Sequence, residues 1–306
     1  MEYVLLVLTV IMAATKAVLN KKVKNGTETL YQTFRFNLFC FVYAFITVFI
    51  VGIRELDTLL NTPILLAFGL AVCTIGMQIF SMKAVQLGPV SVSSLFCYCG
   101  FIIPTVFGCV YYKEPFRVLQ GVGIAMIVFA FIFSTKGGED KKPNAKWLFC
   151  SISALLSSGL IGVFQKIFMR EYPDSSLNNF LIFSFLMILA IGGVYLLVMK
   201  LLQTTRKTTP LDGVSAVGML AERAVWDKKK QLFFAVVLGV LIGLINIVNT
   251  YLSGVLPSVV AFPSINGGAI FATTLLSAIV YKEQPTKRQT IGLAVGILAI
   301  LLIALA

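Results

Sequence analysis

The chain of 306 residues is 58% hydrophobic and only 12% charged, with a mean hydropathy of +0.93. A soluble globular domain cannot hide this much apolar surface, so the composition excludes an ordinary soluble fold. The formal net charge of +12 does not indicate a nucleic-acid partner, because the basic residues lie in short connections between apolar runs.

Apolar runs of about 20 residues recur along the chain, and this is the length that a helix needs to cross the hydrocarbon core of a bilayer. The first run starts at Met1-Glu2, with no basic segment before it and no clear cleavage site, so we expect a retained span and not a signal peptide. The expected fold is an all-α membrane protein with about ten transmembrane helices. The predicted spans are 2–20, 30–52, 63–84, 90–112, 117–135, 147–168, 177–200, 231–252, 258–281 and 289–306.

The lysines and arginines are distributed unequally between the connections. Connections after odd-numbered spans hold 17 of them and connections after even-numbered spans hold five. The five are Arg54, Lys113, Arg117, Lys166 and Arg170. Because basic loops stay on the cytoplasmic side, we expect both termini outside, in a multi-pass protein of the cell (inner) membrane.

Two polar side chains in the first span are candidate substrate ligands. Lys16 and Asn20 share one helical face with Thr9 and Ala13, because the spacings along this stripe are four, three and four. In one interpretation this face lines a wet cavity and the Lys16 ammonium contacts substrate. In the other, Lys16 only extends its ammonium to the lipid headgroups.

Further polar side chains lie on stripes in the third, fourth, sixth and eighth predicted spans. Amides that face lipid are costly unless they find partners, so these stripes are expected to face one central cavity. Hydrogen bonding between helices is the alternative. The candidate substrate-binding residues in these spans are Gln78, Tyr98, Gln165, Asn246 and Asn249.

The ninth span contains the run Pro263-Ser264-Ile265-Asn266-Gly267-Gly268. Proline removes an amide donor and glycine adds backbone freedom, so this run predicts an interrupted helix. Exposed backbone groups at such a break commonly hold substrate, which makes Ser264 and Asn266 candidate ligands, whereas a packing kink is the alternative. Gly100 and Pro104 form a weaker counterpart in the fourth span.

All acidic residues lie at a span end or in a connection, and this argues against a buried carboxylate that would bind an organic cation. Glu114 and Glu283 each follow a helix end, where a carboxylate can cap the next helix. The chain has no histidine, and its six cysteines fall within or at the edges of apolar runs. We therefore expect no metal site, cofactor or disulfide framework, and no recognisable serine–base pair indicates an enzyme.

An internal duplication relates the two halves of the chain. Tyr112-Lys113-Glu114-Pro115 corresponds to Tyr281-Lys282-Glu283-Gln284-Pro285, and a glycine nine residues after each glutamate opens the next span. Further pairs are Pro89 with Pro257, Gln78 with Asn246, Ser81 with Asn249, and Asn20-Lys21 with Gln165-Lys166. Since the unit has five spans, the second copy enters the membrane from the opposite side. The expected repeats are 1–136 and 145–306, with a cytoplasmic connection at 203–230.

These motifs, together with Leu87-Gly88-Pro89-Val90-Ser91, resemble the ten-helix, EamA-like branch of the drug/metabolite transporter superfamily. The resemblance implies a 5+5 inverted repeat with transport between the halves, and it implies no particular substrate. The chain departs from the common pattern in its long 203–230 connection and in lacking basic residues before the first span.

The expected function is secondary transport of a small neutral, zwitterionic or anionic metabolite by alternating access. Amino acids fit the predicted cavity of amides and hydroxyls best. The partners are then a small-molecule substrate and the lipid bilayer, with no nucleic acid, and a homodimer is compatible with this architecture. The alternative is a protein that translocates a lipid headgroup or assists assembly in the membrane.

Overall fold

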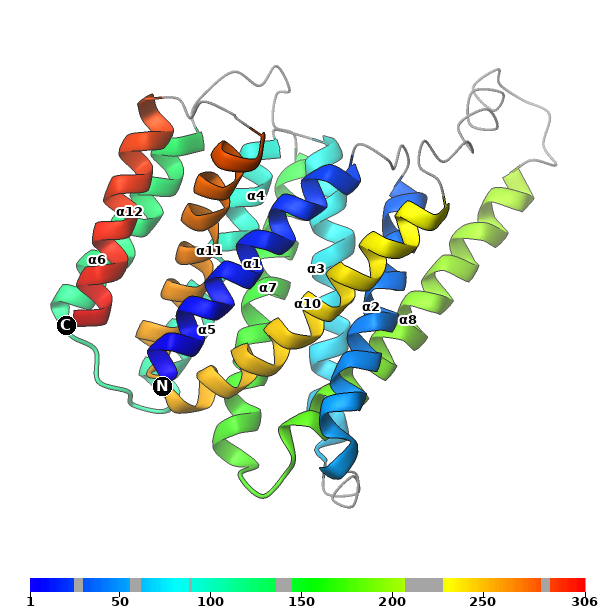
Figure 1. The fold of residues 1–306 in the computed structure, drawn as a ribbon, viewed down its shortest axis with the longest axis horizontal. Helices are drawn as coiled ribbons and strands as arrows, with labels where there is room; N and C mark the ends of the chain where they lie inside the picture. The colour runs from blue at the N-terminus through cyan, green and yellow to red at the C-terminus, as the bar shows by residue number, and fades with distance from the viewer. Residues whose placement is uncertain are drawn as a thin grey trace.

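A computed structural model describes residues 1–24, 30–55, 62–87, 90–135, 145–206, 228–281 and 287–305. Within these ranges the regular structure is helical, and the apolar runs of the sequence form the helices (Figure 1). The helices are α1 (Glu2–Lys24), α2 (Leu30–Gly52), α3 (Ile64–Leu87), α4 (Val90–Cys99), α5 (Ile102–Tyr111), α6 (Val118–Thr135), α7 (Ala145–Glu171), α8 (Leu177–Arg206), α10 (Lys228–Val255), α11 (Ser258–Tyr281) and α12 (Lys287–Leu305).

Seven helical stretches in the described residues are long and apolar enough to cross a membrane. They are Glu2–Asn20, Tyr31–Glu55, Ile64–Ala84, Ala145–Glu171, Leu177–Leu201, Lys229–Val255 and Ser258–Val280, and shorter apolar helices cover Phe96–Tyr111, Val118–Phe133 and Thr290–Ile303. The prediction of an all-α, multi-pass membrane protein is confirmed. Glu283 and most of the 203–230 connection lie outside the described residues.

The fourth predicted span divides into α4 and α5 at Gly100. This is the weaker of the two helix breaks that the sequence predicts. Here the backbone N–H of Gly100 donates to Cys97 O at 3.3 Å and that of Phe101 to Tyr98 O at 3.4 Å. A Cβ on Gly100 would lie 2.9 Å from the Leu155 carbonyl of α7. The glycine therefore allows α7 to approach the break closely.

The predicted interruption of the ninth span is wrong, because α11 continues unbroken through Pro263 and the glycines that follow. Pro263 lies in the second turn, so the missing N–H frees only the carbonyl of Val259. The Asn266 side chain supports the next turn by donating to Phe262 O at 3.0 Å. Free backbone groups are costly at membrane depth, which favours helix over a break.

Both chain ends lie at one end of the bundle, together with the α5–α6, α7–α8 and α10–α11 connections (Figure 1). We call this the terminal end. The opposite end, where α1, α6, α8 and α11 finish, is called the lysine-rich end because most of the basic connections adjoin it in the sequence. With α4 and α5 counted as one span, the helices alternate in direction as the predicted spans require.

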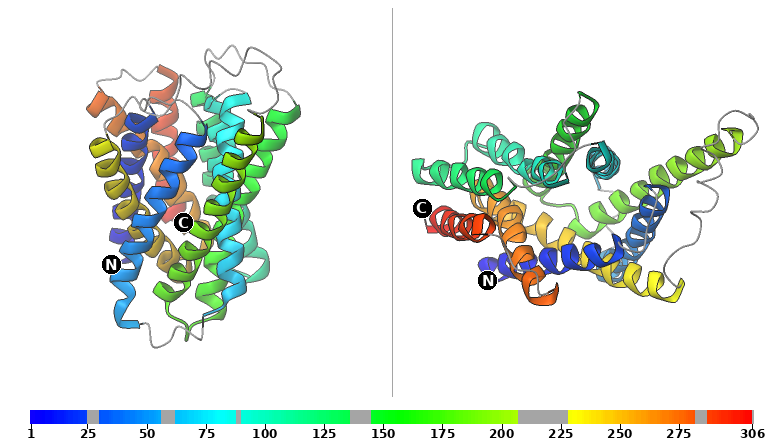
Figure 2. Two further views of the ribbon diagram at one scale, coloured as in Figure 1. Left: turned by 90° about the vertical axis from the view of Figure 1, so that its right-hand side faces the viewer. Right: turned by 90° about the horizontal axis from the view of Figure 1, so that it is seen from above.

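The helices pack in pairs that are far apart in the sequence. The closest packing joins α3 to α7, α2 to α10 and α6 to α12, while α1 lies against both α10 and α11. Seen from above, α6 and α12 lie at one edge of the bundle and α8 extends at the opposite edge (Figure 2). One apolar core fills the space between α2, α3 and α8, and a second joins α6, α11 and α12.

Candidate functional site

The polar residues of α10 and α11 differ in how their side chains are satisfied. Asn246 donates to Ile242 O at 2.9 Å, and Asn266 donates to Phe262 O at 3.0 Å, so each amide nitrogen is bonded within its own helix. Such bonds leave the amide oxygens as the groups through which these residues can contact a ligand.

Besides Ser258 Oγ at the first residue of α11, three other polar atoms on α10 and α11 are buried without a partner. Asn249 Oδ1, Thr250 Oγ1 and Ser264 Oγ make no hydrogen bond in the described part of the chain. A buried polar atom that lacks a partner costs about 1–3 kcal/mol, so native structures rarely retain one unless it serves a ligand or ordered water. Two of the three, Asn249 and Ser264, are predicted site residues.

Gln78 joins two helices at the lysine-rich half of the bundle. Its Oε1 accepts a hydrogen bond from Asn37 Nδ2 of α2 at 3.3 Å. Both side chains are half-buried, and apart from this bond α2 and α3 have few described contacts. The interhelical role that the sequence left open for Gln78 is therefore present.

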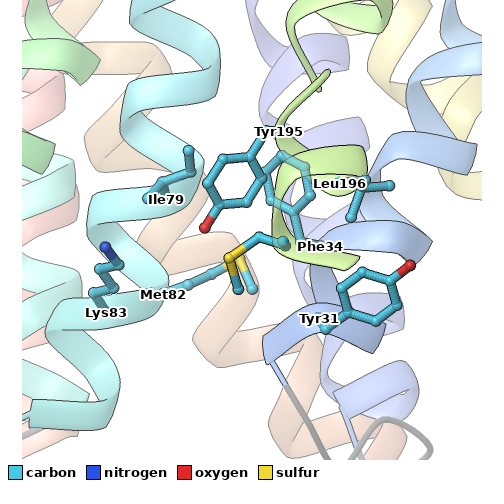
Figure 3. Close-up of a pocket in the computed structure, with 8 residues that line it drawn as sticks. Tyr31, Phe34, Ile79, Met82, Lys83, Tyr195 and Leu196 are labelled. Atoms are coloured by element: carbon cyan, nitrogen blue, oxygen red, sulfur yellow. The ribbon is translucent and has the colours of Figure 1, made fainter. Parts of the chain in front are cut away.

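A small pocket lies beside this Asn37–Gln78 bond, between α2, α3 and α8. Figure 3 shows the Tyr195 hydroxyl directed towards Met82 and Lys83 of α3. Lys83 is exposed and forms no ion pair with any described residue. The pocket is lined by Tyr31, Phe34, Ile79, Met82, Lys83, Tyr195, Leu196 and Met199. Its walls suit an apolar or aromatic body with an anionic group.

The remaining predicted residues are more scattered. Lys16 is half-buried in α1 and close enough to Cys40 of α2 for an electrostatic interaction, whereas Asn20 is exposed. Tyr98 is 37% exposed on α4, and Gln165 is 4% exposed on α7. Their helices adjoin one another, yet no hydrogen bond joins any two of the nine predicted residues in the ranges that the structure describes.

A buried ion pair at the terminal end was not anticipated as a site. Lys166 Nζ lies 2.5 Å from Glu114 Oε1, and the side-chain exposures are 0% and 5%. Arg170, one turn later on α7, reaches the same oxygen at 3.2 Å. Glu114 Oε2 accepts the backbone N–H of Ser258 at 2.6 Å. One carboxylate therefore receives three donors from two helices.

The end of α5 positions this carboxylate. The backbone N–H groups of Tyr112 and Glu114 both donate to Gly108 O, at 3.2 and 3.3 Å. Lys113 between them has φ of 51°, the left-handed conformation that commonly ends a helix. The chain therefore reverses within three residues and directs Glu114 back towards α7 and α11.

The structure differs from the sequence-based predictions for Glu114 and for Lys166. Glu114 caps a helix as expected, but that helix is α11 and not the next one, because the turn at Lys113 directs the carboxylate away from α6. Arg117 at the start of α6 instead donates its backbone N–H to Gln120 Oε1 at 3.0 Å. Lys166 lies inside α7 and not in a connection. The spacing of Lys166 and Arg170, i and i+4, was the available signal, since it places both cations on one face.

The surroundings of Glu114 favour its ionised form. Burial by itself would raise the pKa of this carboxyl, but the hydrogen bond from Lys166 and that from the Ser258 N–H outweigh it and hold the pKa below 4.5. Nearby, burial and the hydrogen bond from the Tyr112 hydroxyl to Glu171, at 3.0 Å, raise the pKa of Tyr112. Both groups therefore keep their charge states through neutral pH.

The fold and the polar interior define a multi-pass helical membrane protein. Residues 1–136 match the EamA-like transporter family, so this part of the chain is an EamA-like transporter domain, and such a domain implies a membrane transporter of unspecified substrate. One solved chain, described as "Crystal structure of protein", superposes with a TM-score of 0.71 at 14% identity, over 98% of this chain and 96% of that chain. This likeness shows the fold alone. No curated protein sequence matches the chain.

Proposed function

We propose that the protein is a secondary transporter that carries a small neutral, zwitterionic or anionic metabolite, preferably amino-acid-like, by alternating access. The transporter class follows from the EamA-like domain. The 5+5 inverted repeat of 1–136 and 145–306 and the nature of the substrate are the proposed additions.

The pattern of helix packing supports two related halves. If the repeat pairs α1 with α7, α2 with α8 and α3 with α10, exchange of the halves converts the α3–α7 contact into the α10–α1 contact. It also converts the α2–α10 contact into the α8–α3 contact, and all four contacts are present. The pairs that the exchange maps onto themselves, α2–α8, α5–α11 and α6–α12, are packed as well. A rocking motion between such halves is the usual basis of alternating access.

The observation that carries the substrate proposal is the set of buried polar atoms without partners on α10 and α11. Asn249 Oδ1, Thr250 Oγ1 and Ser264 Oγ offer one amide acceptor and two hydroxyls, which suit the ammonium and carboxylate groups of an amino acid. The pocket beside Lys83 is a separate feature of the lysine-rich end, lined by residues of α2, α3 and α8.

The test uses purified protein in lipid nanodiscs and a binding screen of amino acids, nucleosides and organic anions. With the best binder, Thr250→Val should lower the affinity by about fivefold, which corresponds to about 1 kcal/mol. The same change should leave thermal stability equal or higher, because it deletes a buried hydroxyl without a partner.

Thr15→Val is the matched control, since the Thr15 hydroxyl is already bonded to Ile11 O at 2.8 Å in its own helix. It should leave affinity unchanged. If Thr250→Val keeps full affinity, the unpaired atoms are not substrate ligands. If reconstituted protein moves fluorescent phospholipid and no soluble metabolite, the metabolite proposal fails in favour of lipid translocation.

A further inference from the structure

We infer that Glu114 is a latch, which holds the terminal end of the bundle closed and must release Lys166 before the space between the halves can open there. The inference rests on the proposed alternating access. It assigns a role to residues that the substrate proposal does not use.

The latch joins segments that are far apart in the chain. Glu114 follows α5, Lys166 and Arg170 belong to α7, and Ser258 is the first residue of α11. Lys166 Nζ also donates to Leu256 O, between α10 and α11, at 3.3 Å. The carboxylate thus holds α5, α7 and the α10–α11 corner together.

Capping alone does not explain this arrangement. The Ser258 N–H needs one acceptor, which an uncharged side chain can provide, whereas burying the Lys166 ammonium carries a desolvation cost. A purely static contact is formed as well or better by apolar side chains. An ion pair has a different property: once separated into water, both ions are well solvated, so the open state is also tolerated. That property suits a contact that has to break.

The two ends of the proposed repeat differ in closure. At the terminal end α7 packs on α10, and a Cβ on Gly254 would lie 2.7 Å from Met169 Cβ. If the two halves are exchanged, α7 corresponds to α1 and α10 corresponds to α3. In the described ranges α1 and α3 do not pack extensively against each other. The structure is therefore closed at the end that Glu114 holds.

Gly108 shows how closely the latch is fitted. A Cβ at this position would collide with the Ser258 side chain and would lie 2.8 Å from Glu114 Oε2. A methyl group there presses on the latch without removing any charge. Gly193 on α8 is a matched control, because a Cβ there meets nothing within 4 Å.

The experiment measures solvent access at the terminal end in nanodiscs. Ser253, 1% exposed on α10, is changed to cysteine in a full-length chain whose six native cysteines are replaced. The rate of reaction with a hydrophilic thiol reagent is compared with that of Ser184→Cys, an equally conservative change at a residue that is 0% exposed on α8. Glu114→Gln should speed the reaction at Ser253→Cys by at least about tenfold and leave Ser184→Cys slow.

An unchanged reaction rate at Ser253→Cys would overturn the latch. Equal acceleration at Ser253→Cys and Ser184→Cys would also overturn it, because it would show a general loosening of the fold. If Glu114→Gln does not accumulate, Gly108→Ala decides: it should speed the Ser253→Cys reaction by about threefold while Gly193→Ala has no effect. The experiment measures solvent access to the introduced cysteine and not transport of substrate. A failed latch therefore leaves the transport proposal standing, and a failed transport assay leaves the latch measurable.

Discussion

The terminal end and the lysine-rich end of the bundle are held together in different ways. At the terminal end, charged side chains join helices that are distant in the sequence: Glu114 binds Lys166 and Arg170, and Glu55 at the end of α2 accepts hydrogen bonds from Ser176 and from Asn178, the latter at 3.1 Å. The Glu114 carboxylate is buried in its contact, whereas Glu55 is exposed.

At the lysine-rich end two neutral hydrogen bonds join helices. Trp147 Nε1 donates to Ser93 Oγ at 2.8 Å, and Asn37 donates to Gln78 across the gap between α2 and α3. The pocket beside Lys83 lies in the same half. A buried carboxylate with two cations thus closes the terminal end, whereas neutral bonds and a pocket lie at the end from which a substrate is expected to enter.

The largest effect expected from this comparison concerns the two lysines placed deepest in the helices. Lys166→Met should lower the free energy of unfolding by about 3 kcal/mol, because it leaves the buried Glu114 carboxylate without its main partner. Lys16→Met should change it by less than about 0.5 kcal/mol, since Lys16 is only half-buried and no described carboxylate depends on it. Denaturant titration of the two variants measures the difference, and equal effects would remove the distinction between the ends.

A second prediction separates packing from charge. Gly108→Ala should destabilise the protein by about 1–3 kcal/mol through the collision with Ser258 and Glu114. Gly193→Ala should be neutral or slightly stabilising, because the added methyl meets no atom and alanine favours helix. Thermal unfolding followed by circular dichroism compares the pair. If Gly108→Ala does not lower the thermal stability, the terminal end accommodates the added methyl group without strain.

At the lysine-rich end the effects should appear in binding and not in stability. Lys83→Gln should weaken binding of anionic ligands by about threefold to tenfold and leave neutral ligands unaffected, because it removes the cation among the described residues that line the pocket. Lys16→Met discriminates in the same assay between its two interpretations: a loss of about tenfold for anions alone places its ammonium in the cavity. If neither variant distinguishes anions from neutral ligands, recognition depends on neutral polar groups.

The smallest effect concerns pH. The folded pKa of Glu114 is lowered, so its stabilising contribution is fully present above 4.5 and is lost only as the pH falls through the folded value. The charged or titratable groups that face it are Lys166 and Arg170 on α7 and Cys109 on α5. Access at Ser253→Cys, corrected for thiolate formation, should therefore stay constant from about pH 8 to about pH 5.5. Opening within that window would contradict the assigned ionisation.

Much of the fold was predictable, because hydrocarbon thickness fixes helix length and the apolar runs show it directly. The α11 break was not, since Pro263 and its glycines look disruptive locally, and the cost of free backbone groups in the membrane overrides local preference. Asn249 and Ser264 remain predicted ligands, and their side-chain oxygens are buried without partners. The sequence could not show that Asn246 and Asn266 bond within their own helices.

The ion pair was missed for a different reason. Glu114 and Lys166 are 52 positions apart, and neither residue type at a helix end distinguishes a solvated charge from a buried one. Only tertiary packing brings them together, through the turn at Lys113 and the close approach at Gly108. The proposed correspondence of Lys166 with Lys21 was visible in the repeat, but the side chain of Lys21 is outside the described residues.

Alternating access through the terminal end is tested most directly by locking that end. Cysteines at Met169 and Gly254 would need a shift of about 1 Å to form a disulfide between α7 and α10. Uptake of the identified substrate into proteoliposomes is measured for this double variant, oxidised and then reduced, in the background without native cysteines. We predict that oxidation abolishes uptake and that reduction restores it. Undiminished uptake by fully cross-linked protein would contradict the account.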